Sequence, residues 1–100
     1  MSMARDEILQ TLSKHRDELR RDYGVRSLAL FGSAARNEAG SESDVDILVE
    51  FDRRIGLFQF IRTKHRLEDL LGIEEVDLVL RNAVIPELQD DIYGEAIDVE

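Results

Sequence analysis

Two stretches decide the fold of this chain: Phe31-Gly32-Ser33-Ala34-Ala35-Arg36 and, after a short polar loop, Ser43-Asp44-Val45-Asp46-Ile47-Leu48-Val49. In an Asp-x-Asp on a strand the two side chains point to the same face, because strand side chains alternate with period two. The apolar run after Asp46 predicts a buried strand, so Asp44 and Asp46 should lie side by side at its start. Two such carboxylates repel each other unless a cation lies between them. We therefore expect a Mg²⁺ ion at this position.

The Gly-Ser element predicts a phosphate site next to these carboxylates. Leu28-Ala29-Leu30-Phe31 indicates a short buried strand, and Gly32 permits a tight turn that a phosphate can approach closely. Ser33 stands where the N-cap of a short helix is expected. The unpaired N–H groups of a helix start favour phosphate. Arg36, one turn along, is placed to add a guanidinium contact.

Together these residues resemble the minimal nucleotidyltransferase (MNT) family of the DNA polymerase β-like superfamily. That pattern is Gly-Ser, about ten residues, Asp-x-Asp, and a third Asp on a later strand. The chain has Gly32-Ser33, ten intervening residues, Asp44-x-Asp46, and then Asp77 within Glu75–Leu80. Asn37 departs from the pattern, since many relatives have Gly after the Arg, but Asn also accepts turn geometry.

The resemblance implies a fold, an activity and a partner. The expected fold is α/β (α+β), with a small mixed sheet of three to four strands flanked by helices. MNT proteins are commonly antitoxins that transfer AMP from ATP to a tyrosine of a HEPN-type toxin. On that analogy Asp44, Asp46 and Asp77 are catalytic and hold two Mg²⁺ ions, while Gly32, Ser33 and Arg36 bind the nucleotide.

Two other functions stay open at this point. A pure binding antitoxin would neutralise its partner by contact alone, and its carboxylate variants would still protect. A small-molecule nucleotidyltransferase, acting for example on an antibiotic, would need a partner subunit or a second copy to complete its acceptor pocket. The sequence shows no such pocket.

The periodicity of apolar residues predicts alternating helices and strands. We expect a helix from about Arg5 to Tyr23, a strand over Ser27–Phe31, and the Asp-x-Asp strand ending near Phe51. A polar loop is expected over Asn37–Ser43. Further along we expect a helix over Leu57–Leu71, a strand over Glu75–Leu80, and a helix that begins near Pro86 and packs through Leu88 and Ile92. Residues 96–99 alternate and fit a short strand or a frayed tail.

Composition bounds the class of protein. One hundred residues with 43% apolar side chains fit a single domain spanning residues 1–100. There is no membrane-length apolar run, no signal-peptide pattern and no cysteine, which together favour a cytoplasmic protein. The net charge of −9 argues against nucleic acid as a direct partner, because such binding needs basic residues.

The remaining polar features are weaker. His15 lies on the apolar stripe of the first predicted helix, where a packed or half-exposed histidine is more common than a metal ligand. The basic run Arg62–Arg66 is most simply the exposed face of a helix, with partner docking as the alternative. No Gly-x4-Gly-Lys-Ser/Thr loop, Gly-x-Gly-x-x-Gly turn, zinc spacing or EF-hand is present.

Overall fold

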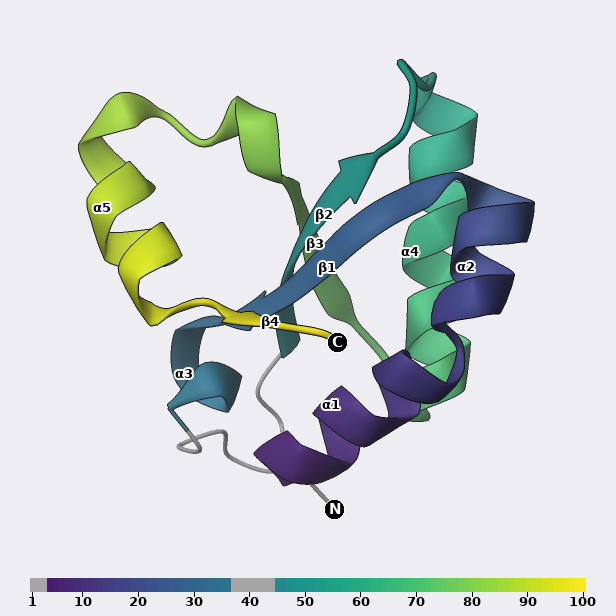
Figure 1. The fold of residues 1–100 in the computed structure, drawn as a ribbon, viewed down its shortest axis with the longest axis horizontal. Coiled ribbons are helices and arrows are strands. Elements are labelled where there is room, and N and C mark those ends of the chain that lie inside the picture. The colour runs from purple at the N-terminus through teal and green to yellow at the C-terminus, as the bar shows by residue number, and fades with distance from the viewer. Residues whose placement is uncertain (1–3, 37–44) are drawn as a thin grey trace.

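The computed structural model describes residues 4–36 and 45–100, which form one four-stranded sheet with helices on both faces (Figure 1). The strands of this sheet are β1 (Val25–Phe31), β2 (Val45–Phe51), β3 (Val76–Leu80) and β4 (Ile97–Asp98). The helices are α1 (Arg5–Lys14), α2 (Arg16–Tyr23), α3 (Gly32–Ala35), α4 (Leu57–Leu71), the 3₁₀ turn η1 (Arg81–Ala83) and α5 (Pro86–Glu95).

The sheet is mixed, in the order β3-β2-β1-β4. Strand β1 runs antiparallel to both β2 and β4, whereas β2 and β3 are parallel. Parallel neighbours need a crossover connection, and α4 provides it. The expected mixed sheet flanked by helices is confirmed, and residues 97–98 are its short fourth strand.

The two faces of the sheet pack against different helices. Leu30, Ile47 and Val76 point to one face, where they form the main core with Leu12 of α1 and Leu67 of α4. The opposite face carries a smaller cluster in which Ala29, Leu48 and Val84 pack with Ile92 and Tyr93 of α5. In Figure 1, α5 lies on the opposite side of the sheet from α1, α2 and α4. The second face is therefore the less covered one.

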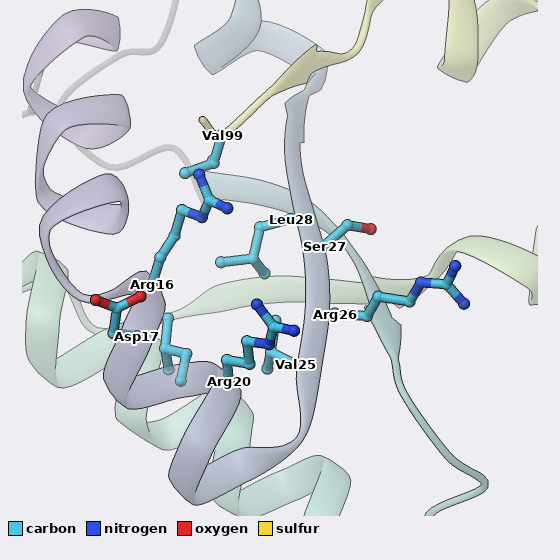
Figure 2. Close-up of a pocket in the computed structure, with 9 residues that line it drawn as sticks. Arg16, Asp17, Arg20, Val25, Arg26, Ser27, Leu28 and Val99 are labelled. Atoms are coloured by element: carbon cyan, nitrogen blue, oxygen red, sulfur yellow. The ribbon is translucent and has the colours of Figure 1, made fainter.

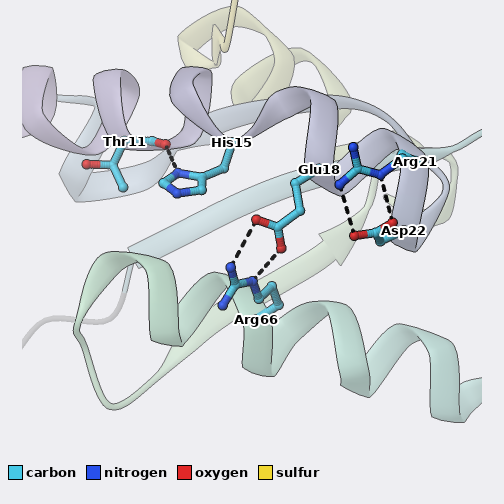
Figure 3. A network of polar contacts seen from close by, with 6 residues as sticks. All are labelled: Thr11, His15, Glu18, Arg21, Asp22 and Arg66. Atoms are coloured by element: carbon cyan, nitrogen blue, oxygen red, sulfur yellow. Dashed lines mark hydrogen bonds and ion pairs between the residues drawn. The ribbon is translucent and has the colours of Figure 1, made fainter.

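The expectation of one helix from Arg5 to Tyr23 is wrong, because the helix breaks at His15. The backbone N–H of His15 bonds the carbonyl of Leu12, three residues back, at 3.2 Å. The carbonyl of Thr11 is 2.9 Å from the imidazole Nδ1 of His15 instead (Figure 3). With its backbone at φ −106° and ψ 10°, His15 ends α1 and precedes α2. The half-buried position expected for this histidine is confirmed.

Two smaller expectations also need correction. The short helix begins at Gly32, with extended Phe31 before it, so Ser33 lies inside the first turn of α3 and is not its N-cap. On α5, Ile92 packs as expected, but Leu88 is 45% exposed, because the helix touches the sheet mainly through its second half. Within the two described ranges, no helix has the length and apolar composition to cross a membrane.

Candidate functional site

Asp46 and Asp77 lie directly opposite each other on neighbouring strands. They are register partners in the parallel pair β2 and β3. Their side chains therefore project from the same face of the sheet, about 4.8 Å apart along the hydrogen-bonding direction at the level of the backbone. Asp46 is half-buried, whereas Asp77 is exposed to solvent. The sheet thus brings together two of the three predicted carboxylates.

Asp44 lies outside the described residues. Among the residues that the structure does describe, no group of three or more Asp, Glu or His side chains is arranged to hold a metal ion. Asp46 and Asp77 alone supply a pair of hard oxygen donors. Such a pair fits Mg²⁺, which proteins usually bind through one or two carboxylates together with substrate phosphates.

Gly32 lies against the Asp46 carboxylate. Phe31, the residue before it, is the register partner of Asp46 on β1. A Cβ added to Gly32 would lie 2.1 Å from Oδ2 and 3.0 Å from Cγ of Asp46, and the φ of Gly32 is +73°. Both the close approach and the left-handed backbone require glycine. The Gly-Ser turn and the Asp-x-Asp strand therefore meet at this point, as the sequence predicts.

Glu95, the last residue of α5, completes the cluster and was missed by sequence reasoning. Its Oε1 accepts a hydrogen bond from the backbone N–H of Gly32 at 3.1 Å. Its Oε2 accepts one from Nη1 of Arg36 at 2.7 Å. Glu95 is 63 residues from Gly32 in sequence, and an acidic residue ending an acidic helix carries no signal of its own. Only the tertiary fold shows the contact.

The basic run Arg62–Arg66 has structural contacts. Arg66 donates hydrogen bonds from Nε at 2.7 Å and Nη2 at 2.9 Å to Glu18 of α2, and these lower the pKa of the Glu18 carboxyl (Figure 3). Lys64 lies 2.6 Å from Glu68, and the guanidinium of Arg62 is 4.8 Å from the centre of the Tyr23 ring. Arg66 and Arg62 therefore tie α4 to α2, and the expectation that the run is simply an exposed helix face is wrong, because Thr63 is fully buried and Lys64 and Arg66 are half-buried.

A cavity of about 180 Å³ lies away from the carboxylates, between α2 and β1. Arg16 and Arg20 extend over it from α2, and Val25 and Leu28 form its apolar side (Figure 2). None of the predicted site residues lines this cavity. The candidate site is instead the cluster of Gly32, Arg36, Asp46, Asp77 and Glu95 on the less covered side of the sheet.

Known proteins are similar to this chain in both sequence and fold. The nucleotidyltransferase domain family matches residues 12–99. The protein adenylyltransferase MntA of Thermococcus cleftensis is 40% identical over 94 residues, which cover 94% of this chain and 94% of that protein.

Solved structures agree with this similarity. One described as a "putative minimal nucleotidyltransferase" superposes with a TM-score of 0.78 at 36% identity and covers 95% of each chain. A structure of tri-AMPylated Shewanella oneidensis HEPN toxin in complex with MNT antitoxin matches at 20% identity, with a TM-score of 0.64, over 92% of this chain and 71% of that one. At that identity the second likeness concerns the fold alone.

Proposed function

Because the chain belongs to the nucleotidyltransferase domain family, we propose that it is a protein adenylyltransferase that transfers AMP from ATP to a tyrosine hydroxyl of a HEPN-type toxin. In this proposal the chain is the antitoxin of a toxin–antitoxin pair. The observation that carries the proposal is the register of Asp46 and Asp77 beside Gly32. This arrangement sets two carboxylates next to a backbone turn that can receive phosphates.

Similar proteins support adenylyl transfer to a protein and a HEPN-type partner. The relative at 40% identity over nearly the whole chain is named a protein adenylyltransferase. The neighbour with the AMPylated HEPN toxin pairs an MNT protein with a modified partner. Exposed Asp77 on the less covered sheet face leaves room for a protein acceptor to approach.

The proposed reaction divides the work among few residues. The acceptor oxygen attacks the α-phosphorus of ATP, the bond from that phosphorus to the bridging oxygen breaks, and pyrophosphate leaves. Asp77 takes the proton of the acceptor hydroxyl. Three groups hold the β and γ phosphates: the backbone N–H of Gly32, the residue Ser33 and the guanidinium of Arg36. Negative charge develops on these phosphates as pyrophosphate leaves.

Asp44, Asp46 and Asp77 are the residues that would hold Mg²⁺, with two ions expected. Bound Mg²⁺ would neutralise phosphate charge and lower the pKa of the acceptor hydroxyl. The proposal also takes residues 1–100 as one minimal nucleotidyltransferase domain. The absence of a direct nucleic-acid partner and the cytoplasmic location stay predictions from the sequence.

The decisive experiment is incubation of the chain with its HEPN partner, ATP and Mg²⁺, followed by intact mass measurement of both proteins. We expect the partner to gain mass in steps of one AMP. Asp46→Asn removes one carboxylate charge at nearly constant size and should lower transfer by orders of magnitude.

Asp98→Asn is the matched control for Asp46→Asn. Asp98 lies on the same sheet face, because its register partner Ala29 shares that face with Phe31 and Asp46, but it lies on β4 beside Arg81. This variant should retain transfer. An unmodified partner that is nonetheless neutralised would support the binding antitoxin instead. Modification of an antibiotic but not of the protein would support the small-molecule enzyme.

A further inference from the structure

The backbone turn proposed to receive the triphosphate already holds an anion from the same chain. The two carboxylate oxygens of Glu95 accept hydrogen bonds from the N–H of Gly32 and from Arg36, at 3.1 Å and 2.7 Å. A backbone N–H and a guanidinium are the donors that phosphate oxygens use in proteins. Glu95 therefore makes with these two groups the contacts that a phosphate group would make.

We propose that Glu95 is an internal competitor for the triphosphate, occupying Gly32 and Arg36 in the nucleotide-free protein and giving them up when ATP binds. This inference rests on the nucleotide site of the proposed function and adds a regulatory residue to it. Glu95 lowers the apparent affinity for ATP, because only the fraction of molecules with Glu95 turned away can accept the phosphates.

Charge favours the displacement of Glu95 once nucleotide is present. The Glu95 carboxylate neutralises Arg36, at 2.7 Å. Once phosphates contact Arg36, a carboxylate remaining nearby would repel them, as Asp46 beside Gly32 also would without a cation. The backbone N–H of Gly32 is a single donor, so a phosphate oxygen that accepts its hydrogen bond releases the Glu95 carboxylate.

The movement requires little rearrangement of the fold. Ile92 and Tyr93 hold α5 against the sheet, where they pack on Ala29 and Leu48, and the Tyr93 hydroxyl also bonds the carbonyl of Arg81. Glu95 lies beyond these anchors, with its side chain 33% exposed, and that of Arg36 is 48% exposed. A rotation of the Glu95 side chain into solvent is therefore sufficient to break its contacts with Gly32 and Arg36.

The test is calorimetric titration with α,β-methylene-ATP and Mg²⁺, an analogue whose α–β linkage cannot be cleaved. Half-exposed ion pairs shift equilibria by a factor of about 1.5 to 5, so Glu95→Gln should bind the analogue more tightly than wild type by a factor in this range. Glu87→Gln makes the same change of charge at the opposite end of the same helix, where Glu87 is exposed. This control should bind like wild type.

A second variant separates occupancy from simple repulsion. Glu95→Asp keeps the charge but is one methylene shorter, so it cannot span both donors and should also tighten binding, by about twofold. AMP, which lacks the β and γ phosphates, should bind wild type and Glu95→Gln equally. Glu95 would not be a competitor for these donors if Glu95→Asp bound the triphosphate analogue no more tightly than wild type. The same would hold if Glu95→Gln increased the affinity for AMP as much as the affinity for the analogue.

Other outcomes would contradict either the role of Glu95 alone or the nucleotide site as well. Weaker binding by Glu95→Gln would mean that Glu95 supports the nucleotide, and binding equal to that of Glu87→Gln would make the contact purely structural. Either result would leave the proposed function standing. If wild type bound no analogue at all, the nucleotide site itself would be wrong, and this inference with it.

Discussion

At the scale of single residues, the approach of Gly32 to Asp46 links backbone geometry to the proposed chemistry. The carboxylate of Asp46 lies where any side chain at position 32 would have to go. The sequence motif names both residues, yet they are 14 positions apart and only the antiparallel pairing of β1 with β2 explains why they meet. Two features therefore require glycine at position 32: the positive φ and the close approach of the Asp46 carboxylate.

Two glycine substitutions separate these constraints. Gly32→Ala and Gly72→Ala both place alanine at positive φ, +73° and +66°, but nothing lies within 4 Å of a Cβ at Gly72. Gly72→Ala should cost about 1–2 kcal/mol of unfolding free energy in urea denaturation, and Gly32→Ala should cost more, because its Cβ would also lie 2.1 Å from a carboxylate oxygen of Asp46. Only Gly32→Ala should also lower AMP transfer, by about tenfold or more, because it displaces the Asp46 carboxylate. Equal activity of the two variants would contradict a role for this contact.

The position of Ser33 inside α3 reverses the stability prediction that an N-cap would give. Replacing an N-cap serine by alanine costs about 0.5–2 kcal/mol, and by glycine only a few tenths. Inside a helix, alanine is the better residue and glycine the worse one. We therefore expect Ser33→Ala to be neutral or slightly stabilising and Ser33→Gly to cost about 0.5 kcal/mol in thermal or urea unfolding. If Ser33→Ala were the less stable of the two variants, Ser33 would act as an N-cap after all.

The same two variants test Ser33 as a nucleotide-binding residue. Both remove the hydroxyl, so both should raise the KM for ATP to a similar degree. Wild-type kinetics in Ser33→Gly would leave phosphate binding to Gly32 and Arg36.

At the scale of elements, the periodicity of apolar residues predicts the helices and strands. It does not predict features that depend on a single side-chain contact. The helix over Leu57–Leu71 and the strand that carries Asp77 follow from apolar spacing, and the structure confirms both. The break at His15 does not follow from apolar spacing. In a continuous helix the backbone N–H of His15 would bond the carbonyl of Thr11, but that carbonyl contacts the imidazole of His15 and the N–H bonds Leu12. The contact of Glu95 with Gly32 joins residues 63 positions apart, and no local pattern encodes it.

The junction between α4 and β3 depends on one carboxylate. Glu68 accepts hydrogen bonds from Lys64 at 2.6 Å and from the backbone N–H of Val76 at 2.9 Å. Burial of Glu68 disfavours its ionised form and is the largest single influence on it, but these bonds together lower its pKa below the usual value. Val76 precedes Asp77, so this carboxylate also fixes the start of the strand that carries a candidate catalytic residue.

Removal of this carboxylate should destabilise the fold in a pH-dependent way. Glu68→Gln should cost about 1–2 kcal/mol at pH 7, because it weakens two charge-assisted bonds. A lowered pKa means that the unfolded chain binds protons first, so the contribution of Glu68 is complete above the unfolded pKa of about 4.3 and is lost as the pH falls through the lower folded value. The difference between wild type and variant in urea denaturation should therefore shrink below about pH 4.

Glu75→Gln provides the control for that measurement. Glu75 pairs with the same lysine at 3.2 Å, but its side chain is 56% exposed. This variant should cost less than about 1 kcal/mol. A loss equal to that of Glu68→Gln would show that the lysine, and not the bond to Val76, carries the stability.

At the scale of the whole molecule, the sheet collects acidic side chains from three separate parts of the chain. Asp46, Asp77 and Glu95 come from β2, β3 and α5, in a chain whose net charge is −9. A cation and a phosphate-bearing ligand should relieve this repulsion together better than either does alone. Binding to the folded state then appears as stability.

Thermal unfolding measures this coupling directly. At a free concentration ten times its Kd, ATP with Mg²⁺ should add about 1.4 kcal/mol, which raises the Tm of a domain of this size by about 5–10 °C. ATP with a chelator, and Mg²⁺ without ATP, should each raise it less. Asp46→Asn should lose most of the shift, and an unchanged Tm in wild type would remove the main support for a nucleotide site.

The crossover through α4 also sets the order in which the site can come into existence during synthesis. Asp46 and Asp77 are neighbours only after β3 has paired in parallel with β2. A ribosome that adds about 5–20 residues per second needs about 2–6 s to travel from one codon to the other. During that interval the nascent chain already carries the Gly-Ser turn and Asp46 but has no second carboxylate beside them. A newly made molecule therefore passes through a period without a complete site, and a truncated translation product that stops before β3 never leaves it.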